Sequence, residues 1–135
     1  MLWYRIGGAL ALGVIFCAAG LDGAPAQEDF PFDRELLLDV RPMKGSKRLP
    51  TLEVEANGAA TIELWCNSAE ARIVVNGESI TISAGEKTGR QCTPERAQAD
   101  DQLLETLSQV AGWRWDGENL VLTGAKELRF RLQTN

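Results

Sequence analysis

The sequence contains no histidine, and this absence removes most catalytic and metal-binding arrangements at once. Histidine is the usual general base at neutral pH and the commonest transition-metal ligand. Ser-His-Asp and Cys-His catalysis are therefore excluded. Glutamates could still support glycoside hydrolysis, but Glu53, Glu55 and Glu63 alternate with apolar residues and are interpreted as the solvated face of a sheet. We predict a protein that is not an enzyme and that binds no metal or cofactor, with a carboxylate-based hydrolase as the less favoured alternative.

The chain also lacks an excess of basic residues. Its formal net charge is -5 over 135 residues, with 14 Lys and Arg against 19 Asp and Glu. Nucleic-acid-binding proteins are normally basic, because the release of counterions from phosphates supplies much of their affinity. We therefore expect no nucleic-acid partner.

Long apolar runs are confined to the N-terminus. After Arg5 the chain is uncharged from Ile6 to Leu21, and Ala24-Pro25-Ala26 then precedes polar residues. This order is typical of a secretory signal peptide, residues 1–26, cleaved after Ala26. The run is shorter than the roughly 20 apolar residues of a stable membrane span. We expect a periplasmic or secreted protein with no stable membrane span after cleavage, and an uncleaved anchor is the alternative.

Cysteine is scarce, and its placement is informative. Of the three cysteines, Cys17 lies in the predicted signal peptide, which leaves Cys66 and Cys92. An even number of cysteines in an oxidising compartment favours a structural disulfide. A redox-active pair is the less favoured alternative, because the spacing is not C-x-x-C and no histidine could activate a thiolate.

The rest of the chain is sized for one domain, which we place at residues 35–135 behind an N-terminal arm, residues 27–34. Strands are expected at 35–40, 52–55, 61–66, 72–75, 79–82, 113–115, 120–122 and 128–132. Asn57-Gly58 and Asn76-Gly77 predict two-residue hairpin turns, the first of type I′. Gly85 to Gly89 is expected to be a connecting loop.

One segment has a helical period. Thr93 can cap a helix, Pro94 suits its first turn, and Leu103 and Leu107 fall on one face, with the acidic residues mostly off that face. We predict an amphipathic helix over residues 94–111, ended by Gly112. The predicted fold class is therefore α+β, a curled antiparallel sheet of hairpins (a meander) with this helix before the last strands.

The chain resembles the META domain family, the family of the heat-shock protein HslJ. The resemblance is carried by Cys66-Asn67, then Thr88 four residues before Cys92, then the leucine-bearing helix and the closing strands. It covers about Leu36 to Leu132, although Trp65 stands where members commonly have glycine. The resemblance implies a small α+β domain found in exported bacterial proteins, linked to stress and antibiotic tolerance and without established catalytic residues.

Two surfaces are candidates for contact with a partner, which we expect to be an envelope protein or peptide. The first is a basic loop, residues 41–50, with Arg41, Lys44, Lys47 and Arg48 in an otherwise acidic protein. The second is the pair Trp113 and Trp115, which share one face of a strand and otherwise pack on the core. The alternative function is a barrel-like module that binds a small ligand or inhibits a protease, favoured by a dry cavity above about 300 Å³. No oligomeric state is predicted.

Overall fold

The computed structural model describes residues 8, 13 and 29–134. Apart from Gly8 and Gly13, the predicted signal peptide with its cleavage site, Cys17 and the first residues of the arm lie outside the described residues. Among the described residues, no helix combines the length and apolar character needed to cross a membrane.

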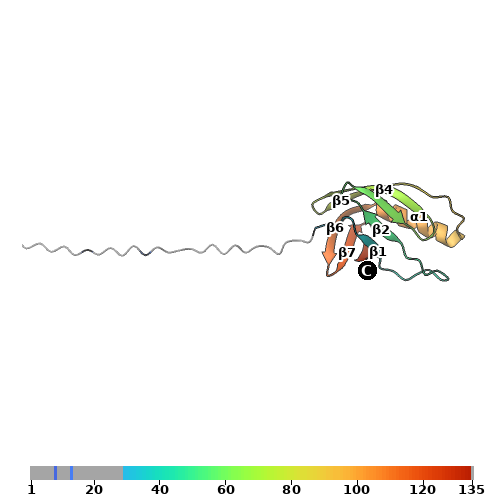
Figure 1. Cartoon of the computed structure of the whole chain (residues 1–135), viewed down its shortest axis with the longest axis horizontal. Coiled ribbons are helices and arrows are strands. Elements are labelled where there is room, and N and C mark those ends of the chain that lie inside the picture. Colours follow the sequence, from blue (N-terminus) through green and yellow to red (C-terminus); the bar gives the residue numbers. More distant parts are fainter. Residues whose placement is uncertain (1–7, 9–12, 14–28, 135) are drawn as a thin grey trace, which may run out of the picture.

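Eight strands form a closed antiparallel barrel in which each strand pairs with its neighbours in sequence. The strands are β1 Glu35–Leu38, β2 Thr51–Val54, β3 Ala59–Glu63, β4 Ser68–Asn76, β5 Ser79–Lys87, β6 Val110–Asp116, β7 Asn119–Gly124 and β8 Leu128–Leu132. The helix found within residues 29–134, α1 Pro94–Ser108, lies between β5 and β6. Figure 1 shows α1 and the longer loops at one end of the barrel, and the described part of the arm, residues 29–34, with the short hairpin turns at the other. We call these the α1 end and the arm end.

The predicted fold class was wrong, because the sheet is not an open, curled meander. β1 pairs with β8, with Leu36 opposite Leu132 and Leu38 opposite Phe130, and this ladder closes the barrel. This pairing joins the first strand to the last, so the two edges of an open sheet are not exposed there. The weakest seam is between β5 and β6, which pair only through Ser79 and Gly112. The described domain is therefore mostly β, with α1 added at one end.

Inward-facing side chains of the strands fill the barrel, and each end is closed by a different element. Leu103 and Leu107 of α1 belong to the buried core and cover the α1 end. Phe30 of the arm is also buried in the core, and its ring packs edge-on against Trp113 with the ring centres 5.4 Å apart. The arm and α1 thus complete one continuous core.

The turns differ from the predicted ones because only glycine adopts a positive φ there. The β2–β3 connection is a loop of four residues, 55–58, with Gly58 at φ +91°, while Asn57 has no positive φ. The type I′ turn at Asn57-Gly58 was therefore wrong. In the next hairpin the turn is Gly77-Glu78, one residue later than expected, with Gly77 at φ +60°.

Helix α1 begins where predicted and ends three residues earlier than predicted. The Thr93 hydroxyl accepts a hydrogen bond from the Arg96 N–H at 3.4 Å, which confirms the N-cap. Ser108 is the last helical residue, and Val110 already belongs to β6, so Gly112 does not end the helix. β5 also runs to Lys87, so three of the five residues of the expected loop at 85–89 are strand.

Replacing Gly58 with alanine is expected to destabilise the domain by about 1–3 kcal/mol. A Cβ at residue 58 would lie 2.7 Å from the Ile73 carbonyl oxygen, on a backbone whose φ is already unfavourable for alanine. Urea unfolding checks this result, with Gly89→Ala as the control, because a Cβ at residue 89 meets nothing within 4 Å. Equal unfolding midpoints for the two variants would contradict it.

Candidate functional site

The predicted disulfide is confirmed, and it lies at the α1 end. Cys66 and Cys92 are bonded, with their Cα atoms 6.1 Å apart. The bond joins the β3–β4 connection to the segment that leads into α1. Such a bond fits an oxidising compartment.

Three polar side chains surround the disulfide, and we call them the polar cluster: Asn67, Thr88 and Asp100. Asp100 is fully buried, and its carboxylate accepts hydrogen bonds from the backbone N–H groups of Cys66 and Asn67 at 3.1 and 2.8 Å. It also accepts one from the Asn67 amide at 3.2 Å. The carboxylate is thus satisfied by three donors, without a cation.

Asn67 also connects Asp100 to the loop after β5 through hydrogen bonds. Its side-chain oxygen accepts hydrogen bonds from the Thr88 hydroxyl at 2.9 Å and from the Arg90 N–H at 2.8 Å. Its amide nitrogen lies 3.1 Å from the Cys92 sulfur. The motif residues Asn67 and Thr88 therefore act with the disulfide to fasten α1 over the barrel.

The polar cluster is structural rather than reactive. The sulfurs of Cys66 and Cys92 and a carboxylate oxygen of Asp100 lie within 4.8 Å of one another. The metal ligand in such clusters is a thiolate, and both sulfurs here are joined to each other. Asp100 was missed at the sequence level, where it was counted with the polar residues of the helix. The signal was its spacing, since residues 100, 103 and 107 lie on one helical stripe.

The basic loop lies at the α1 end, and its four basic residues differ in their ion pairing. Arg48 forms an ion pair with Glu63 at 2.7 Å, whereas Arg41, Lys44 and Lys47 are exposed and form no ion pair within the described residues. Beside the loop is a hollow of about 320 Å³. Its lining consists of Met43, Trp65, Ala99, Gln102, Leu103, Thr106 and Lys126.

The two tryptophans of β6 have different surroundings. Trp113 packs on Phe30 and donates its indole N–H to the Gly77 carbonyl oxygen at 2.7 Å. Trp115 donates its indole N–H to the Asp29 carbonyl oxygen at 3.3 Å, and it borders a hollow of about 510 Å³ at the rim of the arm end. We call this the rim hollow. It is lined by Trp115, Gly117, Glu118, Asn119, Arg131, Leu132 and Thr134.

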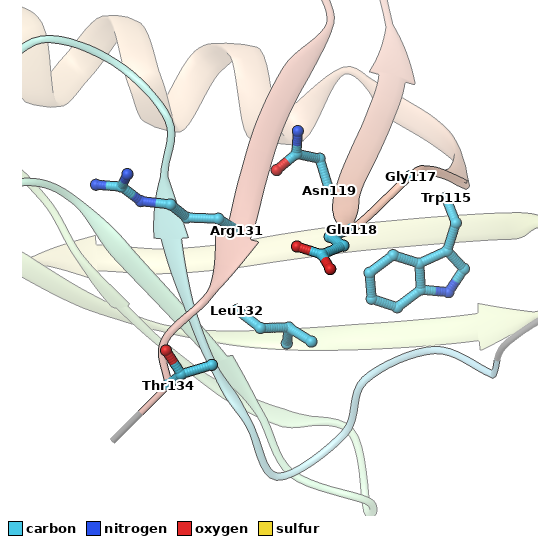
Figure 2. A pocket seen from close by; sticks show the side chains of 7 residues that line it. All are labelled: Trp115, Gly117, Glu118, Asn119, Arg131, Leu132 and Thr134. Atoms are coloured by element: carbon cyan, nitrogen blue, oxygen red, sulfur yellow. The ribbon is translucent and has the colours of Figure 1, made fainter.

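The rim hollow combines an aromatic ring with polar groups, as Figure 2 shows. The Glu118 carboxylate points between the Trp115 indole and Leu132, while the Arg131 guanidinium extends away from the indole. The hollow is larger than the volume of about 300 Å³ set for an apolar-ligand cavity, but its charged lining is not that of a dry apolar cavity. This is a composition that fixes the orientation of a polar ligand on an apolar surface.

The neighbouring acid Asp116 is already paired. A hydrogen bond from Arg129, followed by the positive charge of the same guanidinium, lowers the pKa of Asp116 below its ordinary value of 3.8. A second ion pair, Arg114 with Glu127 at 3.2 Å, connects β6 to the residue before β8. Unlike Asp116, the Glu118 carboxylate forms no hydrogen bond or ion pair within residues 29–134.

Replacing Asp116 with asparagine is expected to lower stability slightly at neutral pH and not at all in strong acid. Since folding lowers the pKa of Asp116, its contribution is present above the unfolded pKa and is lost as the pH falls through the folded value. Solvent screens this exposed pair, so the effect is small. Melting curves of both proteins between pH 7 and pH 2 check this result, and a gap that persists at pH 2 would contradict it.

Comparisons with known proteins agree with the fold. A family model described as "META domain" matches residues 22–135. A protein whose structure was determined by NMR is 15% identical with a TM-score of 0.58, over 73% of this chain and 88% of that one. A DUF4847 family protein from Bacteroides vulgatus is 15% identical with a TM-score of 0.50, over 61% and 57% of the two chains. At this identity both likenesses concern the fold alone, and no curated protein matches the chain.

Proposed function

The chain belongs to the META domain family, and from that premise we propose that it is an exported, non-enzymatic binding module with a stress-related role at the cell envelope. Its partner in this proposal is an envelope protein or peptide. The N-terminal sequence pattern and the Cys66–Cys92 disulfide support export. The stress-related role is what the family resemblance implies.

The rim hollow is the observation on which the binding proposal depends. It places part of an indole ring and Leu132 beside Glu118 and Asn119, which have no side-chain partner within the described residues. Exposed aromatic surface with unpaired polar groups around it is characteristic of binding sites, because a ligand can both cover the ring and satisfy the polar atoms. The arm fixes the ring by accepting the Trp115 hydrogen bond, so the surface is preorganised.

The acids support recognition more than catalysis. Asp100, the buried carboxylate, accepts three hydrogen bonds inside the polar cluster and has no access to a substrate. Asp116 is held by Arg129. Glu118 stands alone in the rim hollow, whereas carboxylate-based glycoside hydrolysis needs two opposed acids.

Photo-crosslinking in intact cells tests this proposal. A photoreactive amino acid in place of Asn119, which lines the rim hollow, should give a discrete adduct with an envelope protein. The control is the same amino acid in place of Thr81, an exposed residue of β5. Adducts at neither position in any growth condition, or the same adducts at both, would contradict the proposal.

The basic loop is the second candidate contact surface, favoured by the unpaired charges of Arg41, Lys44 and Lys47. If it meets an acidic partner, the double change Lys44→Glu and Lys47→Glu should reduce the yield of adducts at least fivefold. The matched control, Arg72→Glu with Arg90→Glu, makes the same change of net charge at exposed residues outside the loop and should leave the yield unchanged. An unchanged yield for the loop variant would remove the loop from the contact surface.

A small ligand in the rim hollow is the alternative to a protein partner, and the volume of about 510 Å³ favours it. Native mass spectrometry of protein purified from its own host distinguishes the two. A defined added mass that disappears on denaturation would support the small ligand over the protein partner.

A further inference from the structure

From the lining of the rim hollow we infer that it binds an organic cation, an ammonium or guanidinium group carried on an apolar stem. The source we favour is a lysine or arginine side chain of the partner. This inference rests on the proposed function, because it names the chemistry by which the same site would recognise its partner.

The first step concerns charge. The Glu118 carboxylate points into the hollow and makes no ion pair within the described residues. The acid two residues earlier, Asp116, is by contrast already paired with Arg129. A cation entering the hollow would therefore meet a carboxylate that has no ion-pair partner among the described residues, on a protein whose net charge is -5.

The second step concerns the aromatic ring. The indole of Trp115 lies beside the Glu118 carboxylate in Figure 2, and both border the same hollow. The face of a tryptophan ring attracts cations more strongly than any other side-chain ring. Carboxylate and indole thus favour the same sign of charge, and an anion would be repelled by both.

The third step concerns the apolar stem of the ligand and the guanidinium group of Arg131. Leu132 and the Trp115 ring offer an apolar wall on which methylene groups can pack. Arg131 also lines the hollow, but its guanidinium extends away from the indole and does not form an ion pair with Glu118. It can instead meet a carbonyl or carboxylate of the same ligand, while the hollow holds the cation.

Binding of small capped amino acids to the purified protein tests the inference. The probes are Nα-acetyl-lysine amide, Nα-acetyl-arginine amide and Nα-acetyl-norleucine amide, the last having a similar stem without the charge. The indole N–H signal of Trp115 reports binding by NMR and is assigned with the Trp115→Phe variant. We expect saturable shifts with the two cationic probes and at least tenfold weaker binding of the norleucine probe.

Two matched variants test whether the carboxylate of Glu118 binds the cationic probe. Glu118→Gln should weaken binding of the lysine probe at least fivefold. Glu105→Gln makes the same change of net charge at an exposed residue of α1 and should leave this binding unchanged. Equal binding of the norleucine and lysine probes, or equal affinities of the two variants, would overturn the inference. Tighter binding of free 1,5-diaminopentane than of the lysine probe would uphold the cation chemistry and assign its source to a small amine.

The two proposals can fail separately. An adduct at position 119 whose yield is the same in the Glu118→Gln background would leave the binding module standing and overturn the cation chemistry. Binding of the lysine probe without any adduct in cells would uphold the cation chemistry and contradict the protein partner.

Discussion

Replacing Asp100 with alanine is expected to lower the free energy of unfolding by about 3–5 kcal/mol. The change removes the acceptor of three hydrogen bonds, those from the Cys66 N–H, the Asn67 N–H and the Asn67 amide. Each buried donor left without a partner costs about 1–3 kcal/mol. Urea unfolding followed by far-UV circular dichroism measures the loss.

The next residue of α1 provides the control. Asp101 is exposed and pairs with Lys87 at 2.6 Å on the surface, so Asp101→Ala should cost less than about 1 kcal/mol. Asp100→Asn should fall between the two, because one oxygen remains while an NH₂ group faces the donors. Differences between such variants are resolved to about 0.5 kcal/mol. If Asp100→Ala and Asp101→Ala lower the free energy of unfolding by amounts that differ by less than this, the role assigned to Asp100 is refuted.

The sequence predicted local structure well because each local signal depends on nearby residues. The Thr93 cap, the Pro94 start and the alternation in β2 to β5 all concern contacts within a hairpin or a helical turn. The exact turns were less predictable. In both turns the positive φ angle is adopted by a glycine. Gly58 and Gly77, rather than the asparagines before them, therefore determine where the chain reverses.

Closure of the barrel could not be predicted in this way. It depends on the pairing of β1 with β8, which are the first and the last strands of the domain in the sequence. Both strands carry inward residues such as Leu36 and Phe130, but their alternation fits an open sheet equally well. No local feature of the sequence identifies β8 as the partner of β1. The sequence therefore predicted a meander in which the first and last strands are not paired.

The candidate site was predicted in part for the same reason. Trp115 stood out by residue type, whereas Glu118 looked like any acid in a turn, and only the fold brings it beside the indole. Arg48 was grouped with the other cations of its loop, yet the register of β3 places Glu63 within reach of it. Side chains that act together here come from different hairpins, and their proximity is a property of the closed barrel.

Reducing the Cys66–Cys92 disulfide is expected to lower the free energy of unfolding by about 3–4 kcal/mol. The bond spans 26 residues, and its removal restores the corresponding conformational entropy to the unfolded chain. For a domain with a total stability of about 5–15 kcal/mol this is a large fraction, and the melting temperature should fall by more than about 10 °C. Melting curves with and without a phosphine reductant measure the change, and an unchanged melting temperature would contradict a structural role.

The disulfide and the polar cluster should also act as one unit, because Asn67 contacts both the Cys92 sulfur and the Asp100 carboxylate. Cys66→Ser with Cys92→Ser should abolish the effect of reductant. Adding Asp100→Ala to it should cost at least about 1 kcal/mol less than the same change in the parent protein, since contacting residues are not additive. Strict additivity would mean that the bond and the carboxylate fasten α1 independently, even though Asn67 contacts both.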